Sequence, residues 1–202
     1  IPELSMIKSP RLTRTILPLG LLVVLPLRAE LPGSLEKIPL YPGMTLQKEE
    51  KPPLGEGLLK GALRTYTVKA PIEDVVAFYE KALGITQREG ELGDPNALKV
   101  GQFVQPALQI KFWNEDHLVD GNFGKDGVSS SGWIKKALSQ RKKDRENAWI
   151  QDGSVMWYYR DTSGTMTEMQ ILFQDLSIDE DLKRYQLKSE VIIRAMRYEY
   201  HP

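Results

Sequence analysis

The sequence predicts a single α+β domain, with one antiparallel sheet of about five or six strands and two main helices packed on one side. Three observations support this prediction. Short alternating or β-branched runs recur along the chain, and one segment has a clear helical period. The composition is that of a globular protein, with 41% hydrophobic and 27% charged residues among 202. Residues 1–33 are assigned to a signal peptide and its upstream residues, and residues 34–202 to the domain.

The N-terminal segment has the pattern of a secretory signal peptide. Basic residues between positions 8 and 14 precede an apolar run over residues 16–27, and the small residues Ala29 and Gly33 follow. About twelve helical residues span only ~18 Å, which is less than the ~30 Å of a bilayer core. We therefore expect an exported bacterial protein, periplasmic or secreted, with no stable transmembrane span after cleavage. The sequence leaves open whether the leader is cleaved or retained as an anchor.

The first elements of the domain are marked by Pro and Gly. Pro42-Gly43 predicts a turn between extended segments, and the Pro- and Gly-rich residues 48–57 predict a surface loop. Residues 58–69 carry strand-forming side chains. A helix is predicted over 71–83, because apolar residues recur every three or four positions and Gly84 can end it in a left-handed conformation.

The second half of the chain predicts more strands and a second helix. Residues 107–113 alternate as a half-buried strand does, and Ser131 can cap a helix over 132–146 whose second half is basic. A meander of three strands is predicted next, with turns at Asp152-Gly153 and at 162–164.

The C-terminal region is ambiguous between helix and strand. Ser177 and Glu180 form a capping-box pattern that predicts a short helix over 178–185. Residues 188–200 fit a helical stripe as well as a strand, and their β-branched and aromatic side chains favour a strand.

Composition and motifs exclude several classes of function. Lys+Arg and Asp+Glu are both 27, so no net charge attracts nucleic acid. The absence of cysteine excludes disulfides, thiolate nucleophiles and the usual zinc sites. No glycine loop matches a phosphate-binding pattern and no nucleophile elbow is present, so we expect no cofactor and assign no catalytic or metal-binding residue.

Two groups of residues are candidates for ligand binding. The acidic and histidine side chains of "NEDH" lie at the start of a long Gly-rich segment, where they would suit a metal or a general base; an ordinary solvated loop has the same composition. The aromatic run at 157–159 would form a binding platform if its outer rings are uncovered, and ordinary core if a helix covers them. The candidates are Glu115, Asp116, His117, Asp120, Trp157 and Tyr159.

The basic run "KKALSQRKKDR" at 135–145 allows two interpretations. It would suit an anionic partner, such as a membrane surface or a polyanion. The neutral chain and the nearby Asp144 and Glu146 favour a solvated helix face instead.

Two resemblances rest on the segment "IPLYPGM" and on "YTVKAPIEDVVAFYEKAL" at 66–83. Together they resemble a pattern in small, exported, uncharacterised bacterial proteins, in which a Tyr-Pro-Gly segment precedes a Tyr-x-Val-x-Ala-Pro strand and a helix. Met44 stands where that pattern has a small residue. The strand and helix also resemble the start of START-like helix-grip domains. That likeness implies a sheet closed around a hydrophobic ligand and a long C-terminal helix, which residues 179–200 would have to supply.

These observations favour a non-catalytic binding or envelope-associated accessory domain, with an envelope protein or a small hydrophobic ligand as its partner. A START-like carrier of a hydrophobic ligand is the first alternative. A metal-dependent or carboxylate-based hydrolase using Glu115, Asp116, His117 and Asp120 is the second. The ligand, the partner and the oligomeric state are not predicted.

Overall fold

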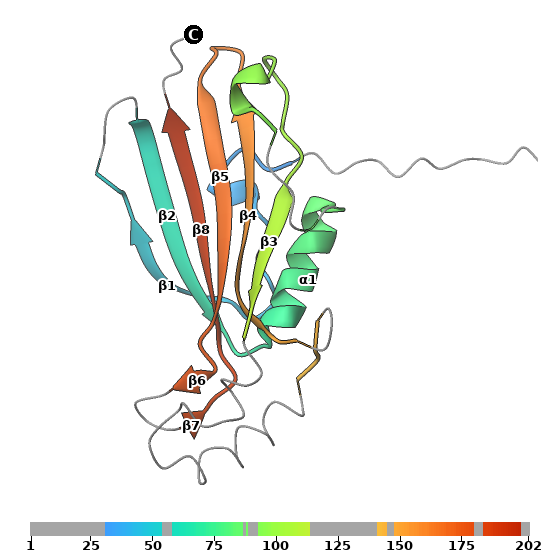
Figure 1. Cartoon of the computed structure of the whole chain (residues 1–202). Coiled ribbons are helices and arrows are strands. Elements are labelled where there is room, and N and C mark those ends of the chain that lie inside the picture. Colours follow the sequence, from blue (N-terminus) through green and yellow to red (C-terminus); the bar gives the residue numbers. More distant parts are fainter. Residues whose placement is uncertain are drawn as a thin grey trace, which may run out of the picture.

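Six antiparallel strands form one twisted sheet, which is the largest element of the described residues (Figure 1). The computed structural model describes residues 31–53, 58–86, 88, 93–113, 141–144, 148–179 and 184–198. The strands are β1 (Thr45–Glu50), β2 (Leu58–Val68), β3 (Ala107–Phe112), β4 (Ile150–Arg160), β5 (Met166–Asp175) and β8 (Ser189–Tyr198). Their order is β1-β2-β8-β5-β4-β3, so the last strand of the chain lies at the centre of the sheet.

The helix α1 (Ile72–Leu83) confirms the helix predicted over 71–83. Gly84 ends it with φ +62°, and the N–H of Ile85 donates to the carbonyl of Glu80 at 2.8 Å. The apolar stripe of α1 is fully or almost fully buried and packs against β4 and β5. Its members are Ile72, Val75, Val76, Tyr79 and Leu83.

An N-terminal strap, defined here as residues 31–44, covers another part of the same face of the sheet. In Figure 1 the strap is the blue segment that passes behind the strands. It contains the 3-10 turn η1 (Leu35–Lys37), and Leu35 and Ile38 are buried in the core. The predicted turn follows, with the N–H of Met44 donating to the carbonyl of Tyr41 at 3.2 Å and Gly43 at φ +81°.

One hydrophobic core lies between the sheet and these two covering segments. Alternate residues of the four central strands point into it, as strand geometry requires. The largest fully buried side chains from the strands are Trp157, Phe173, Leu108, Ile150, Met169, Ile171 and Ile193. A second 3-10 turn, η2 (Pro95–Ala97), lies between α1 and β3 along the chain. None of the helices in the described residues is long and apolar enough to cross a membrane.

The prediction of two main helices is wrong, and the protein is mostly β. Within the described ranges α1 is the one helix longer than a 3-10 turn. Of the helix expected over 132–146, residues 141–144 are described and they are not helical, while the others lie outside the described residues. The strap occupies the face of the sheet where a second helix was expected, which explains how a single helix suffices.

The predicted turn at Asp152-Gly153 is also wrong, because β4 runs through it without a break. Gly153 pairs with Ile110 on one side and Phe173 on the other. A Cβ at Gly153 would lie 3.0 Å from the carbonyl oxygen of Gln109. Because Gly153 has no side chain, β3 and β4 can approach each other closely at this position.

The short helix predicted over 178–185 is replaced by a two-stranded ribbon, β6 (Ile178–Asp179) and β7 (Arg184–Tyr185). The Ser177 hydroxyl, expected to cap that helix, accepts from the N–H of Lys188 at 3.0 Å and donates to its carbonyl at 3.1 Å. These two bonds join Ser177 to Lys188 at the base of the ribbon. The Ser177 hydroxyl therefore does not cap a helix. The strand favoured for 188–200 is confirmed by β8, which excludes the long C-terminal helix that a START-like domain needs.

The strand β1 lies at one edge of the sheet, and all six of its residues are exposed. Its register with β2 shifts between Leu46 and Lys48, which places a bulge at Gln47. Lys48 and Glu50 form an ion pair at 2.6 Å along this edge. The loop predicted over 48–57 is thus partly strand.

Substitution of two adjacent isoleucines of β8 tests which face of the sheet is packed against the core. Ile193→Ala is expected to lower the free energy of unfolding by about 2–5 kcal/mol, because Ile193 is 1% exposed. Ile192→Ala, on the opposite face and half-buried, is the matched control and is expected to lower it by about 1 kcal/mol or less. Urea denaturation measures both, and a larger effect at Ile192 would contradict the assignment of the core face.

Candidate functional site

The structure describes two of the six predicted ligand-binding residues, Trp157 and Tyr159. Glu115, Asp116, His117 and Asp120 lie outside the described residues. Trp157 is fully buried, and its indole Nε1 donates to the carbonyl of Pro32 at 2.8 Å. Tyr159 stacks on Phe103 with ring centroids 4.3 Å apart. Both side chains point to the covered face of the sheet, where they contact the strap and the core.

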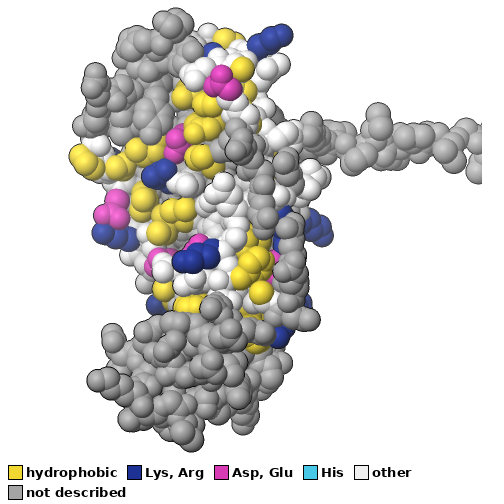
Figure 2. Space-filling view, in the orientation of Figure 1, with side chains coloured by type: hydrophobic (Ala, Val, Ile, Leu, Met, Phe, Trp, Pro, Cys, Tyr) yellow, Lys and Arg dark blue, Asp and Glu magenta, His cyan; other side chains and the backbone are white. Residues whose placement is uncertain are grey.

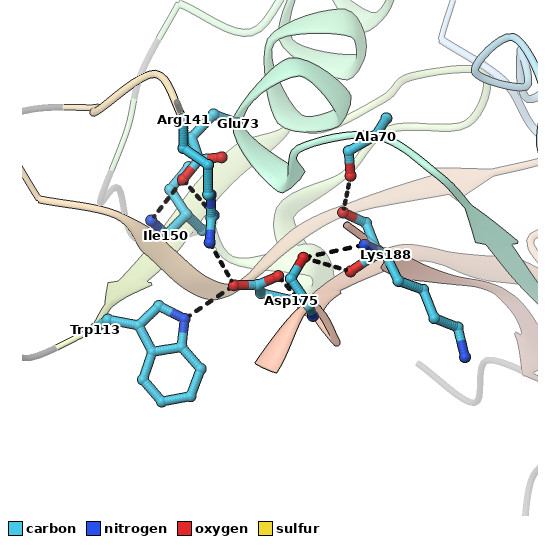
Figure 3. Close-up of polar contacts among 9 residues, drawn as sticks. Ala70, Glu73, Trp113, Arg141, Ile150, Asp175 and Lys188 are labelled. Atoms are coloured by element: carbon cyan, nitrogen blue, oxygen red, sulfur yellow. Dashed lines mark hydrogen bonds and ion pairs between the residues drawn. The ribbon is translucent and has the colours of Figure 1, made fainter. Parts of the chain in front are cut away.

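The most unusual polar group of the described residues is a buried charge network at one end of the sheet (Figure 3). The Arg141 guanidinium donates to Glu73 Oε1 at 2.6 Å and to Asp175 Oδ2 at 2.8 Å. All three side chains are at most 7% exposed. Two further groups join them, since Ile150 N donates to Glu73 Oε1 at 3.2 Å and Trp113 Nε1 donates to Asp175 Oδ2 at 3.1 Å.

The charge network connects parts of the chain that are far apart in the sequence. Glu73 lies in the first turn of α1, Asp175 ends β5, Ile150 begins β4 and Trp113 follows β3. Next to it, Ser189 Oγ at the start of β8 donates to the carbonyl of Ala70 at 2.7 Å. The ends of four strands and the start of the helix are thus fixed relative to one another by polar contacts.

Burial dominates the electrostatics of Glu73. Desolvation raises the pKa of its carboxyl above the usual 4.5, although the attraction of Arg141 lowers it. One carboxylate oxygen, Oε2, is buried and has no hydrogen-bond partner among the described residues, and the same holds for Arg141 Nε. For Arg141, burial lowers the pKa, but the two carboxylates outweigh it and the net pKa is raised.

Neighbouring ion pairs attach the basic segment 141–144 to the helix. Lys142 Nζ lies 3.3 Å from Asp74 Oδ1, and Arg88 pairs with both Glu80 and Asp144. The Arg88 pKa is raised, mainly by its hydrogen bond to Glu80. The described part of the basic run therefore contacts acidic groups of the protein itself.

The charge network is better explained as a structural connection between α1 and the strand ends than as a reactive centre. None of its charged members lines any of the three hollows of the described residues that are given below. No three acidic or histidine side chains of the described part lie close enough together to hold a metal ion. Among the described residues the two carboxylates of the network are at most 7% exposed, and the exposed surface has to be searched elsewhere.

The face of the sheet opposite α1 and the strap is the candidate binding surface, called the open face below. No described helix or strand packs across it. Figure 2 shows this side, with hydrophobic side chains in yellow spread between separated basic and acidic groups. Large apolar side chains from four adjacent strands lie half-buried on the open face: Leu63, Met156, Tyr158, Leu172, Ile192 and Met196.

Charged groups on the open face are largely paired with each other. Arg194 Nη2 lies 2.9 Å from Glu168 Oε1 on the neighbouring strand. Lys111 and Asp152 face each other between β3 and β4, with 3.9 Å between Nζ and Oδ2. The opposite charges within each pair offset one another locally.

An open hollow of about 570 Å³ crosses β3, β4, β5 and β8 on this face. Its apolar lining residues are Ile110, Leu172, Phe173 and Ile192. Amide, hydroxyl and charged side chains line the rest: Gln109, Lys111, Asp152, Ser154, Gln174 and Glu190. Another hollow of about 590 Å³ lies near the turn at Pro42, and one of about 180 Å³ lies beneath the strap.

Sequence reasoning missed both the charge network and the open face. Glu73 and Glu80 are seven residues apart and so lie on one side of α1, which was a signal that basic groups would meet them there. The consecutive apolar residues Val191, Ile192 and Ile193 were a signal that β8 has apolar side chains on both faces.

The sequence matches no protein-family model, and neither a curated protein nor a solved structure is significantly similar to it. The geometry of the described residues is therefore the basis for the functional proposal.

Two adjacent basic residues test the anchoring role of the network. Arg141→Met retains an apolar stem but leaves Glu73 and Asp175 buried without a cation, so the free energy of unfolding is expected to fall by about 3–5 kcal/mol. Lys142→Met is the matched control; Lys142 is 80% exposed and the expected loss is less than about 1 kcal/mol. Chemical denaturation measures both, and equal losses would contradict the anchoring role.

Glu73 is expected to make stability depend on pH. Because burial raises its pKa in the folded state, its stabilising contribution is fully present below the unfolded value of 4.5 and is lost as the pH rises through the folded pKa. Glu73→Gln lacks this titration. In urea unfolding, the stability of the natural protein relative to the variant should therefore decrease as the pH rises above 4.5. An increase would mean that Arg141 lowers the pKa of Glu73 more than burial raises it.

Proposed function

We propose that this protein is an exported, non-catalytic binding domain that contacts an envelope protein through the open face of its sheet. The supporting observation is the set of half-buried apolar side chains on four adjacent strands, which no described element covers. A sheet face that carries several large apolar side chains and is not covered by a described element is a candidate binding site. The signal-peptide pattern of the first thirty-odd residues supports the export part of the proposal.

The chemistry of the open face favours a protein as the partner. Methionine and tyrosine are enriched at protein interfaces, and the open face carries Met156, Met196 and Tyr158. Methionine is flexible and polarizable, so it adapts to an irregular opposing surface. The paired charges leave no strong field, which suits a partner whose contact surface is likewise nearly neutral.

A hydrophobic-ligand carrier receives less support from the same geometry. Carriers enclose most of the ligand surface, in cavities of roughly 300–1,000 Å³. The larger hollows described above are open and bordered by charged or amide groups, and the hollow beneath the strap has only about 180 Å³. The core side is filled by large side chains such as Trp157 and Phe173. The hydrolase alternative depends on residues outside the described part and gains no support from it.

Site-specific photo-crosslinking in the producing cell tests the proposal. A benzophenone amino acid at Leu172 or Met156 is expected to crosslink to one envelope protein, identifiable by mass spectrometry. The same amino acid at Lys81, an exposed position on α1, is the control and should not produce that crosslink. With purified components, Leu172→Asp should weaken binding by at least about tenfold, and Lys81→Asp should leave it unchanged.

Several outcomes would overturn the proposal. One is equal crosslinking from Lys81 and Leu172, and another is a crosslink between two copies of this chain alone. A lipid that co-purifies in native mass spectrometry and is lost in Leu172→Asp would instead favour the carrier. The binding comparison is valid when Leu172→Asp has the same unfolding temperature as the natural protein. If that temperature is lower, Leu172→Gln is used in its place.

A further inference from the structure

The first three residues of the strap pack against the core. Pro32 is buried, and its carbonyl oxygen accepts the hydrogen bond from Trp157 Nε1 at 2.8 Å. Trp157 is fully buried, so no water can replace that acceptor without a rearrangement of the core. Leu31 is partly buried and packs against the same core.

Gly33 lies against the stacked rings of Phe103 and Tyr159. A Cβ at this position would be 3.7 Å from Tyr159 Cδ1 and 3.8 Å from Phe103 Cζ, which is ordinary van der Waals distance. The two rings are 4.3 Å apart between centroids and 21° from parallel. The backbone of the strap therefore covers this aromatic pair as well as Trp157.

We propose that Leu31, Pro32 and Gly33 remain on the mature domain, so that proteolytic removal of the leader ends on the N-terminal side of Leu31. The proposal rests on the export proposed above. The sequence offers two small residues for cleavage, Ala29 and Gly33. Cleavage after Ala29, which lies outside the described residues, leaves all three strap residues in place, whereas cleavage after Gly33 removes them.

Cleavage after Gly33 would damage the core in two ways. It would remove the acceptor of a buried indole N–H, and a buried donor without an acceptor is strongly unfavourable. It would also take away Leu31, which packs against the core, and the buried Pro32, and so expose apolar surface. A mature chain that begins at Ser34 is therefore expected to be much less stable than one that begins at Leu31.

Two truncated chains that begin at Leu31 and at Ser34, each after the same initiating methionine, test the stability difference. The unfolding temperature of the chain from Ser34 is expected to be lower by roughly 5–10 °C. N-terminal sequencing and intact mass of the protein exported from cells that express the full chain test the cleavage position. We expect an N-terminus at or before Leu31.

Trp157→Phe in both truncated chains identifies the hydrogen bond as the cause. In the chain from Leu31 the substitution removes a satisfied N–H and should lower the unfolding temperature. In the chain from Ser34 the same substitution removes an N–H that already lacks its acceptor. The unfolding temperature should therefore fall clearly less, because the change in side-chain volume is the same in the two chains. Equal effects in the two chains would contradict a role for the Pro32 carbonyl.

A mature N-terminus at Ser34 or beyond, or equal stability of the two truncated chains, would overturn the proposal. Neither measurement needs a partner, so failure of the open face to bind would not affect the result. Recovery of the protein solely in the cytosol would count against export, while the comparison of the truncated chains would still decide whether the strap residues belong to the domain.

Discussion

The buried guanidinium of Arg141 is the interaction on which the arrangement of the helix and the strand ends depends. It joins Glu73 at the start of α1 to Asp175 at the end of β5, and Glu73 in turn accepts from the first N–H of β4. A buried ion pair often contributes little stability compared with a hydrophobic replacement, but the loss of one partner is severe. The network therefore acts mainly as a geometric constraint, and it fixes where α1 crosses the sheet.

This constraint also explains why the two faces of the sheet differ. With α1 held over β4 and β5, the strap fills the remaining part of that face, and Trp157 joins the strap to the sheet through Pro32. Both covering segments lie on one side. The opposite side carries apolar side chains among paired charges, and a small, mostly β domain retains such a surface most readily when it has a partner.

The elements predicted correctly are those whose signals are local. The helix over 71–83 has its stripe and its Gly84 end within fourteen residues, and β8 has consecutive β-branched side chains. The errors arose where distant contacts override a local signal: Gly153 lies beside Gln109, and the Ser177 hydroxyl bonds to Lys188. Glu73 and Arg141 are 68 residues apart, so a single sequence contains no indication that they pair. The open face could not be assigned before the layers were known.

The bulged, charged strand β1 has a consequence for the behaviour of the protein at high concentration. A sheet with one bare apolar side is prone to lateral growth, in which strands of neighbouring molecules add to its margin and form fibrils. The irregular register at Gln47 and the Lys48–Glu50 pair make such addition unfavourable at β1, because an incoming strand would find neither regular spacing nor a neutral border. The β1 edge is thus a poor template for the addition of a strand from a neighbouring molecule.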